Sequence, residues 1–174
     1  RVLDNPLQDI PLCAVLTNPV FAFTEEELAE IRIHCRKGLL YDGLQSYQKN
    51  GNNEVLAGKI DAFMKVLEKY RKMIPYTPIH ELLHLFMEEV GYYYYMSALP
   101  AGEQRKANMQ QLLEKAINFE KTSYHGLFHF IRYIEQMQKY DVDMGEANIQ
   151  DENANVVRIM SIHKSKGLEF PICF

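Results

Sequence analysis

The sequence lacks several features that would place it in a well-defined class at once. It has no tryptophan and only three cysteines in 174 residues: Cys13, Cys35 and Cys173. These cysteines show no Cys-x-x-Cys pair and no Cys/His spacing of a zinc site, and their apolar surroundings predict buried, reduced thiols in a cytoplasmic protein. No apolar run is long enough to cross a membrane, and no signal peptide is evident. The sequence therefore gives no indication of a transmembrane segment or of a cysteine-based metal site.

Positive charge is also scarce. The chain has 19 Lys and Arg against 23 Asp and Glu, which gives a formal net charge of -4. A broad nucleic-acid-binding surface is normally basic, so any contact with nucleic acid is expected to be local. With 47% hydrophobic residues, the chain can bury a core as one domain. Because it ends at Phe174 inside an apolar run, we expect it to be a piece of a larger protein.

Apolar residues recur with helical periodicity over most of the chain. The first helix is expected within Asp4–Thr17, with Asp4 or Asn5 as its cap, or Asp9 as the cap before Pro11. Further helices are predicted after the Thr24-x-x-Glu27 capping box, over Glu54–Ile74, from Thr77-Pro78 onward, over Glu103–Thr122 and over Gly126–Lys139.

Two segments are predicted to connect these helices. The stretch from Gly38 to Asn53 is rich in Gly, Asn, Gln and Tyr, and we expect a loop with at most a short helix around Leu44–Lys49. The stretch from Asp141 to Asn155 is acidic and polar, which predicts an exposed connector.

Two side-chain patterns on the expected helices invite a functional interpretation. His80 and His84 have the i, i+4 spacing of a metal pair, but their order differs from the His-Glu-x-x-His of zinc proteases and no third ligand is evident. We therefore expect exposed helix histidines and no metal site. The run Tyr92–Tyr95 points in all directions around a helix, so some rings should be buried. It could stack on bases, but the lack of interleaved Arg or Lys favours packing between helices.

The most informative stretch is the last one. Two apolar runs, Val156–Met160 and Phe170–Phe174, flank a polar segment, and the first run is predicted to be a buried strand. Ligands gather at loops that follow such strands in open α/β sheets. Hydroxyls, His163 and two lysines can hold phosphates, and Glu169 can accept a hydrogen bond from a ribose hydroxyl. The alternative is a solvated turn with ordinary surface lysines.

The order of residues in this segment favours the first interpretation. The pattern Ser161-x-His163-x-x-Lys166-Gly167-Leu168-Glu169-Phe170 resembles motif V of the UvrD/Rep-like helicases of superfamily 1. Lys164-Ser165 within it, and Pro171 after it, most resemble the bacterial helicase/nuclease branch of that family. Weaker resemblances cover the opening of the family's inserted 2B subdomain and its last helices before motif V: Asp4–Leu12, Gly126–Glu135 and Met144–Ala147.

The resemblance implies a mainly α fold, a helical subdomain inserted in a RecA-like α/β motor domain. Residues 1–150 would form the 2B-like helical subdomain. Residues 151–174 would begin the returning RecA-like 2A segment and carry motif V in a short strand-loop-strand.

The resemblance also implies roles for single residues. Ser161, His163 and Lys164 would approach the DNA backbone. Glu169 would hydrogen-bond the nucleotide ribose, and Gly167 would allow the tight turn between these contacts. The lysine of the motif, at position 166, would either contact phosphate or hold the loop.

The chain contains no Gly-x-x-x-x-Gly-Lys-[Ser/Thr] loop and no Asp-Glu pair after an apolar strand. By itself it is therefore expected to be inactive and to hold no cofactor, while the parent protein would use ATP and Mg²⁺. The resemblance implies an ATP-dependent 3′–5′ DNA helicase and exonuclease of the bacterial cytoplasm. It would act in double-strand break repair and recombination on single-stranded and duplex DNA, beside a second helicase/nuclease subunit. The alternative is a non-enzymatic helical protein-interaction module whose terminal loop only mimics motif V.

Overall fold

A computed structural model describes residues 1–139, 161, 163 and 166. Residues 1–139 form eight helices and no strand, which confirms the mainly α class for this part of the chain. The helices are α1 Asp9–Leu16, α2 Glu25–His34, α3 Leu40–Asn50, α4 Glu54–Met73, α5 Ile79–Glu89, α6 Tyr92–Ala98, α7 Gly102–Glu120 and α8 Leu127–Lys139. The expected connector and the expected strand-loop-strand fall almost entirely outside the described residues.

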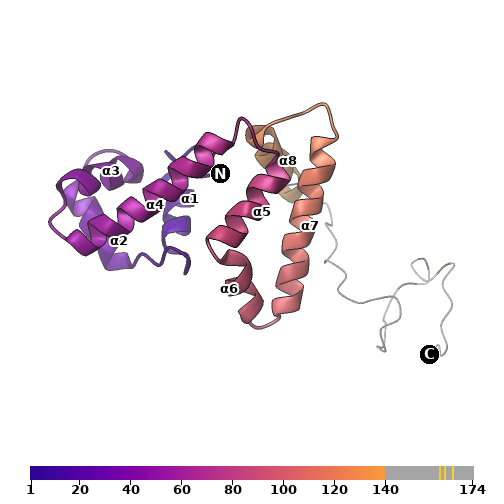
Figure 1. The fold of residues 1–174 in the computed structure, drawn as a ribbon, viewed down its shortest axis with the longest axis horizontal. Coiled ribbons are helices and arrows are strands. Elements are labelled where there is room, and N and C mark those ends of the chain that lie inside the picture. Colours follow the sequence, from indigo (N-terminus) through magenta and orange to yellow (C-terminus); the bar gives the residue numbers. More distant parts are fainter. Residues whose placement is uncertain (140–160, 162, 164–165, 167–174) are drawn as a thin grey trace.

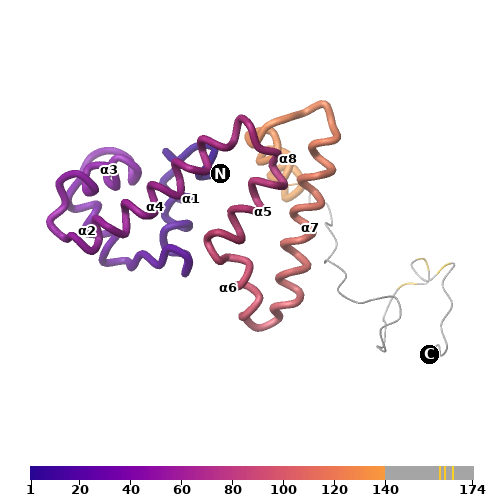
Figure 2. The backbone as a smooth tube through the Cα atoms, viewed as in Figure 1, coloured from indigo at the N-terminus to yellow at the C-terminus, as the bar shows by residue number. Residues whose placement is uncertain are grey.

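The helices form two groups along the long axis of the molecule (Figure 1). Helices α1–α4 make up one end and helices α5–α8 the other, and the chain crosses between them where α4 leads into α5 (Figure 2). Among the described residues, none of these helices is both long enough and apolar enough to span a membrane.

Local hydrogen bonds explain where several helices begin. The Thr24 hydroxyl accepts a hydrogen bond from the Glu27 N–H at 3.2 Å, and the Glu27 carboxylate accepts one from the Thr24 N–H at 2.9 Å, which confirms the predicted capping box. Of the two predicted starts for the first helix, the later one is correct to within one residue, with Gln8 instead of Asp9 as the N-cap. Asn5 accepts the Leu7 N–H in a turn instead of capping a helix, and α1 begins at Asp9 itself.

Helix α3 is the largest departure from the sequence prediction. The segment expected to be a loop forms an eleven-residue helix, in which the Asp42 carboxylate accepts the Leu39 N–H at 3.0 Å. A Cβ at Gly43 would lie 3.2 Å from the Ile31 side chain, so this glycine permits the close approach of α2 and α3. The buried face has helical spacing that the polar composition obscured: Leu40, Leu44 and Tyr47.

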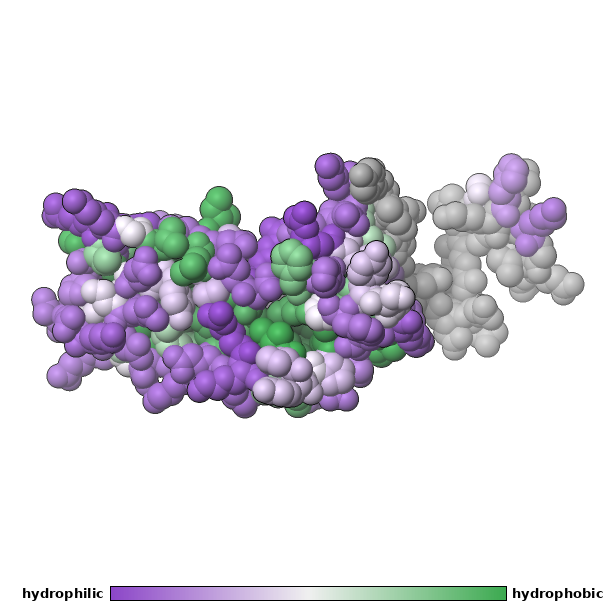
Figure 3. Space-filling model, turned by 90° about the horizontal axis from the view of Figure 1, so that it is seen from above, coloured by the Kyte–Doolittle hydropathy of each residue, from purple (hydrophilic) through white to green (hydrophobic). Residues whose placement is uncertain are grey.

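Two clusters of buried apolar side chains hold the groups together. The first surrounds the inner face of α4 and includes Ile60, Phe63 and Leu67 of the stripe predicted for that helix, together with two further side chains: Leu56 and Met64. The second joins α5, α7 and α8: Ile79, Ala116, Phe119, Leu127 and Phe130. Leu3 packs against both. Hydrophilic side chains cover most of one long face, and hydrophobic ones show through near its middle (Figure 3).

The junction of α4 and α5 is fixed by one aromatic side chain. Tyr70 is buried, and its ring meets that of Phe86 edge-on at a centroid distance of 5.1 Å. Its hydroxyl donates to Glu89 Oε2 at 2.5 Å, and Lys69 Nζ donates to the same oxygen at 2.5 Å. These two hydrogen bonds lower the pKa of Glu89, while burial and the carboxylate raise the pKa of Tyr70. The junction therefore combines packing with a charge-assisted hydrogen bond.

Two of the three thiols lie in the described part of the chain. Cys13 and Cys35 are free and half-buried, whereas full burial was expected. Cys13 packs at the rim of the first apolar cluster, so one side of it stays in water. Cys35 follows the last residue of α2, and its thiol donates to the Lys37 carbonyl oxygen at 3.2 Å. Cys173 lies outside the described residues.

Candidate functional site

The segment that resembles motif V is described at three positions. Ser161, His163 and Lys166 all have exposed side chains, so a hydroxyl, an imidazole and an ammonium group are accessible to a ligand. Such groups are typical donors to phosphate oxygens. The other three predicted site residues lie outside the described residues: Lys164, Gly167 and Glu169. The geometry that joins the six residues thus stays a prediction.

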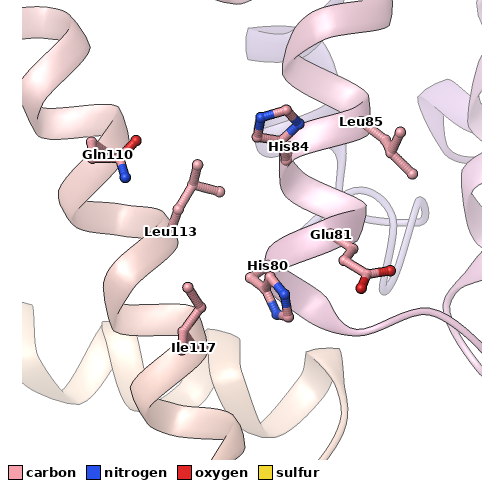
Figure 4. Close-up of a pocket in the computed structure, with 7 residues that line it drawn as sticks. All are labelled: His80, Glu81, His84, Leu85, Gln110, Leu113 and Ile117. Carbon is pink, nitrogen blue, oxygen red and sulfur yellow. The ribbon is translucent and has the colours of Figure 1, made fainter.

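A second candidate lies between α5 and α7. An open groove with a volume of about 510 Å³ separates the two helices, and both contribute side chains to it (Figure 4). In this view His80 and His84 of α5 are on the side of that helix nearer to α7, and they face Gln110, Leu113 and Ile117. Glu81 and Leu85 complete the lining. The groove therefore combines an apolar wall on α7 with two imidazoles on α5.

One carboxylate organises the beginning of α5. Glu120, at the end of α7, accepts a hydrogen bond from the Ile79 N–H, one of the donors that a helix N-terminus leaves without an intrahelical partner. Its other oxygen, Oε2, lies 2.5 Å from His80 Nδ1. Because a carboxylate only accepts hydrogen bonds, Nδ1 carries the hydrogen in this contact, which leaves Nε2 as the nitrogen that can hold a lone pair for a ligand. Glu120 thereby fixes both the helix start and the orientation of the imidazole.

The two histidines differ in their surroundings. His84 is exposed, as predicted, and its Nδ1 lies 3.5 Å from Glu88 Oε2, one turn further along α5. For His80 the prediction of an exposed histidine is wrong, because the side chain is only 34% exposed and packs against Glu120. Sequence reasoning missed Glu120 altogether. It lies 40 residues away, and nothing in its local sequence marks it as a partner.

Within the described residues, no three His, Cys, Asp or Glu side chains gather as a ready-made metal cluster. The two imidazoles of α5 are thus not joined by a third ligand of these types.

The tyrosine run of α6 differs from its prediction. None of the four rings is buried, and Tyr94 is 68% exposed. The rings of Tyr93 and Tyr94 meet edge-on at a centroid distance of 6.0 Å, so they contact each other at the surface. Because α6 has only seven residues and packs on one side against α7, most of its circumference faces water.

Comparison with known proteins gives a consistent result. The family profile described as UvrD-like helicase C-terminal domain matches residues 13–174. The chain is 51% identical over 172 residues to AddA, an ATP-dependent helicase/nuclease protein, of Acetivibrio thermocellus, and the match covers 99% of this chain and 14% of that protein. The AddA of Thermoanaerobacter pseudethanolicus is 45% identical over 172 residues, and that of Bacillus mycoides is 44% identical over 177 residues. The chain spans 14% of the length of each of these relatives.

Proposed function

The chain belongs to the UvrD-like helicase C-terminal domain family, and from this premise we propose that it is the part of an ATP-dependent helicase/nuclease that carries motif V and the helical body before it. The observation that supports the proposal is the ten-position pattern Ser161–Phe170, which lies inside the matched region. Relatives that are 43–51% identical over nearly the whole chain are named as ATP-dependent helicase/nuclease proteins of the AddA type.

We divide the chain as the family pattern suggests. Residues 1–150 are the helical 2B-like subdomain, inserted in a RecA-like α/β motor domain, and residues 151–174 begin the returning 2A segment. The continuous helical architecture of residues 1–139 supports the first part of this division.

The proposed DNA contacts come from the first half of motif V. Ser161, His163 and Lys164 approach the backbone of single-stranded DNA, and the exposure of Ser161 and His163 is compatible with that role. Backbone contacts of this kind position a strand without reading its sequence, which suits a motor that moves along any sequence. Lys166 either contacts a phosphate as well or holds the loop.

The proposed nucleotide contacts come from the second half. The carboxylate of Glu169 accepts hydrogen bonds and suits a ribose hydroxyl, and Gly167 allows the backbone to turn between the two ligands. The donor set of this chain does not suit the ATP phosphates, because the sequence offers no glycine-rich phosphate loop. The phosphates and Mg²⁺ would thus be held by other parts of the parent protein.

In the parent protein, these residues serve a bacterial cytoplasmic 3′–5′ helicase and exonuclease in double-strand break repair and recombination. Its substrates are single-stranded and duplex DNA, and its partner is a second helicase/nuclease subunit of the AddB/RexB type. The net charge of -4 favours a second candidate for the helical body, namely contact with protein instead of DNA.

The test is Glu169→Ala in the parent protein. Loss of a charge-assisted hydrogen bond of about 1.5–3 kcal/mol should raise the KM for ATP by about tenfold or more, while affinity for single-stranded DNA without nucleotide is kept. ATP hydrolysis is measured against ATP concentration at saturating DNA. An unchanged KM and turnover would falsify the nucleotide role.

Two further variants make the test specific. His163→Ala should show the reverse pattern, with weaker binding of single-stranded DNA and an unchanged KM for ATP at saturating DNA. Glu68→Ala removes an exposed carboxylate from α4 and should leave both quantities as in the unmodified protein. If His163→Ala and Glu68→Ala bind DNA equally well, motif V does not contact DNA as proposed.

A further inference from the structure

The groove between α5 and α7 is lined by two imidazoles from successive turns of α5. His80 and His84 lie four residues apart on α5, and side chains with this spacing are neighbours on successive turns, with Cβ atoms about 5–6 Å apart. Both rings lie on the side of α5 nearer to α7 (Figure 4). Their i, i+4 spacing on one helix face is therefore that of a pair that can chelate a metal.

A carboxylate lies near the Nδ1 atom of each imidazole. His80 Nδ1 donates to Glu120 Oε2 at 2.5 Å, and His84 Nδ1 lies 3.5 Å from Glu88 Oε2. Metal-binding histidines usually donate their second N–H to a carboxylate in this way, which fixes the ring and makes the free nitrogen more basic. In His80 the nitrogen that remains for a ligand is Nε2, while exposed His84 is held only by the longer contact and can present its own Nε2.

We propose that His80 and His84 form a two-histidine binding site for a divalent late first-row transition metal ion, such as Ni²⁺, Cu²⁺ or Zn²⁺. Imidazole nitrogens suit these ions, whereas Mg²⁺ prefers oxygen ligands. The groove is open to solvent, so water completes the coordination sphere, and the amide oxygen of Gln110 on α7 faces the same space. This site is independent of the proposed helicase function.

The apolar wall strengthens the case for an ion over a larger ligand. Leu113 and Ile117 line the α7 side and offer no hydrogen bonds, so a polar small molecule would find few partners there. An ion held from the α5 side keeps its remaining ligands in the open part of the groove and needs nothing from this wall.

The test is calorimetric titration of the 174-residue chain, without a polyhistidine tag, with NiCl₂. One Ni²⁺ should bind per chain, and MgCl₂ should give no binding heat. His80→Gln and His84→Gln should each weaken Ni²⁺ binding by about tenfold or more, since each leaves a single imidazole. Glutamine suits helix interiors, and its amide N–H can still donate to the carboxylate at either position.

The matched control is His129→Gln, which removes an exposed histidine from α8 and should leave the Ni²⁺ affinity unchanged. A second measurement uses the unmodified chain and nuclear magnetic resonance. Substoichiometric Cu²⁺ should broaden the imidazole proton resonances of His80 and His84 before those of the other histidines. Absence of Ni²⁺ binding, or equal affinity in the variant that lacks both His80 and His84, overturns the proposal.

Discussion

At the scale of single residues, Tyr70 connects the two halves of the helical body. Its buried ring packs on Phe86, and its hydroxyl shares Glu89 Oε2 with Lys69. The hydroxyl of this buried phenol is satisfied by that carboxylate. The hydroxyl therefore contributes stability beyond the area that the ring buries.

We expect Tyr70→Phe to lower the free energy of unfolding by about 1 kcal/mol. The ring contact stays, one hydrogen bond to a carboxylate is lost, and Glu89 keeps Lys69 and water as partners. Chemical denaturation followed by circular dichroism measures the difference. Tyr76→Phe is the control, because Tyr76 is 88% exposed and its hydroxyl is satisfied by water. Equal stabilities of the two variants would show that the Tyr70 hydroxyl makes no net contribution.

At the scale of helices, two glycines should respond in opposite ways to the same substitution. Gly58 lies inside α4, and a Cβ there would meet no atom within 4 Å. Gly102 begins α7, and a Cβ there would lie 2.0 Å from the backbone oxygen of Ser97 in α6. The first position tolerates a side chain, whereas the second requires the α6–α7 turn to shift.

Gly58→Ala should therefore stabilise the protein by about 0.5–1 kcal/mol, because alanine loses less backbone entropy in a helix. Gly102→Ala should destabilise it, because a clash with main-chain atoms cannot be relieved by rotating a side chain. Thermal unfolding of both variants and of the unmodified chain shows whether each substitution raises or lowers the stability. A stabilising Gly102→Ala would contradict the close approach of α6 and α7.

How much of each helix the sequence predicts depends on the strength of its apolar stripe. Helix α4 follows from the spacing of Ile60, Phe63, Leu67 and Tyr70, with Pro75 beyond its end, and the structure agrees. Helix α3 has the same kind of stripe, but the glycines and polar residues around it suggest a loop. The formation of α3 depends on tertiary packing, because the missing side chain at Gly43 lets α2 pack closely against this helix. The packing partner of a helix is not contained in its own sequence.

At the scale of the whole molecule, the two candidate sites differ in how far they could be predicted. The motif V pattern is contiguous over ten residues, so the sequence alone predicts which functional groups it offers. The sequence does not predict how these groups are arranged in space. The contact between His80 and Glu120 joins residues that are 40 positions apart, and only the packing of α5 on α7 brings them together. Sequence reasoning could find the two histidines but not the carboxylate that orients one of them.

The N-terminal segment links the two groups of helices, and weakening this link should make them unfold less cooperatively. Leu3 packs against both apolar clusters, and Arg1 Nε lies 3.2 Å from Glu135 Oε1 of α8. Figure 1 shows the N-terminus in the middle of the molecule, where the groups meet. Since the exposed ion pair contributes little, the apolar contact of Leu3 should carry most of this link.

We expect Leu3→Ala to lower the free energy of unfolding by about 1–2 kcal/mol and to broaden the denaturant transition, with a smaller slope m. The reason is that two clusters that share fewer contacts unfold less cooperatively. Urea denaturation, followed by circular dichroism, measures both quantities. Leu7→Ala is the control, because Leu7 belongs to the same segment but is 48% exposed. If Leu3→Ala shows the same steep slope as Leu7→Ala, contacts between α4 and α5, centred on Tyr70, suffice to make the two clusters unfold as one.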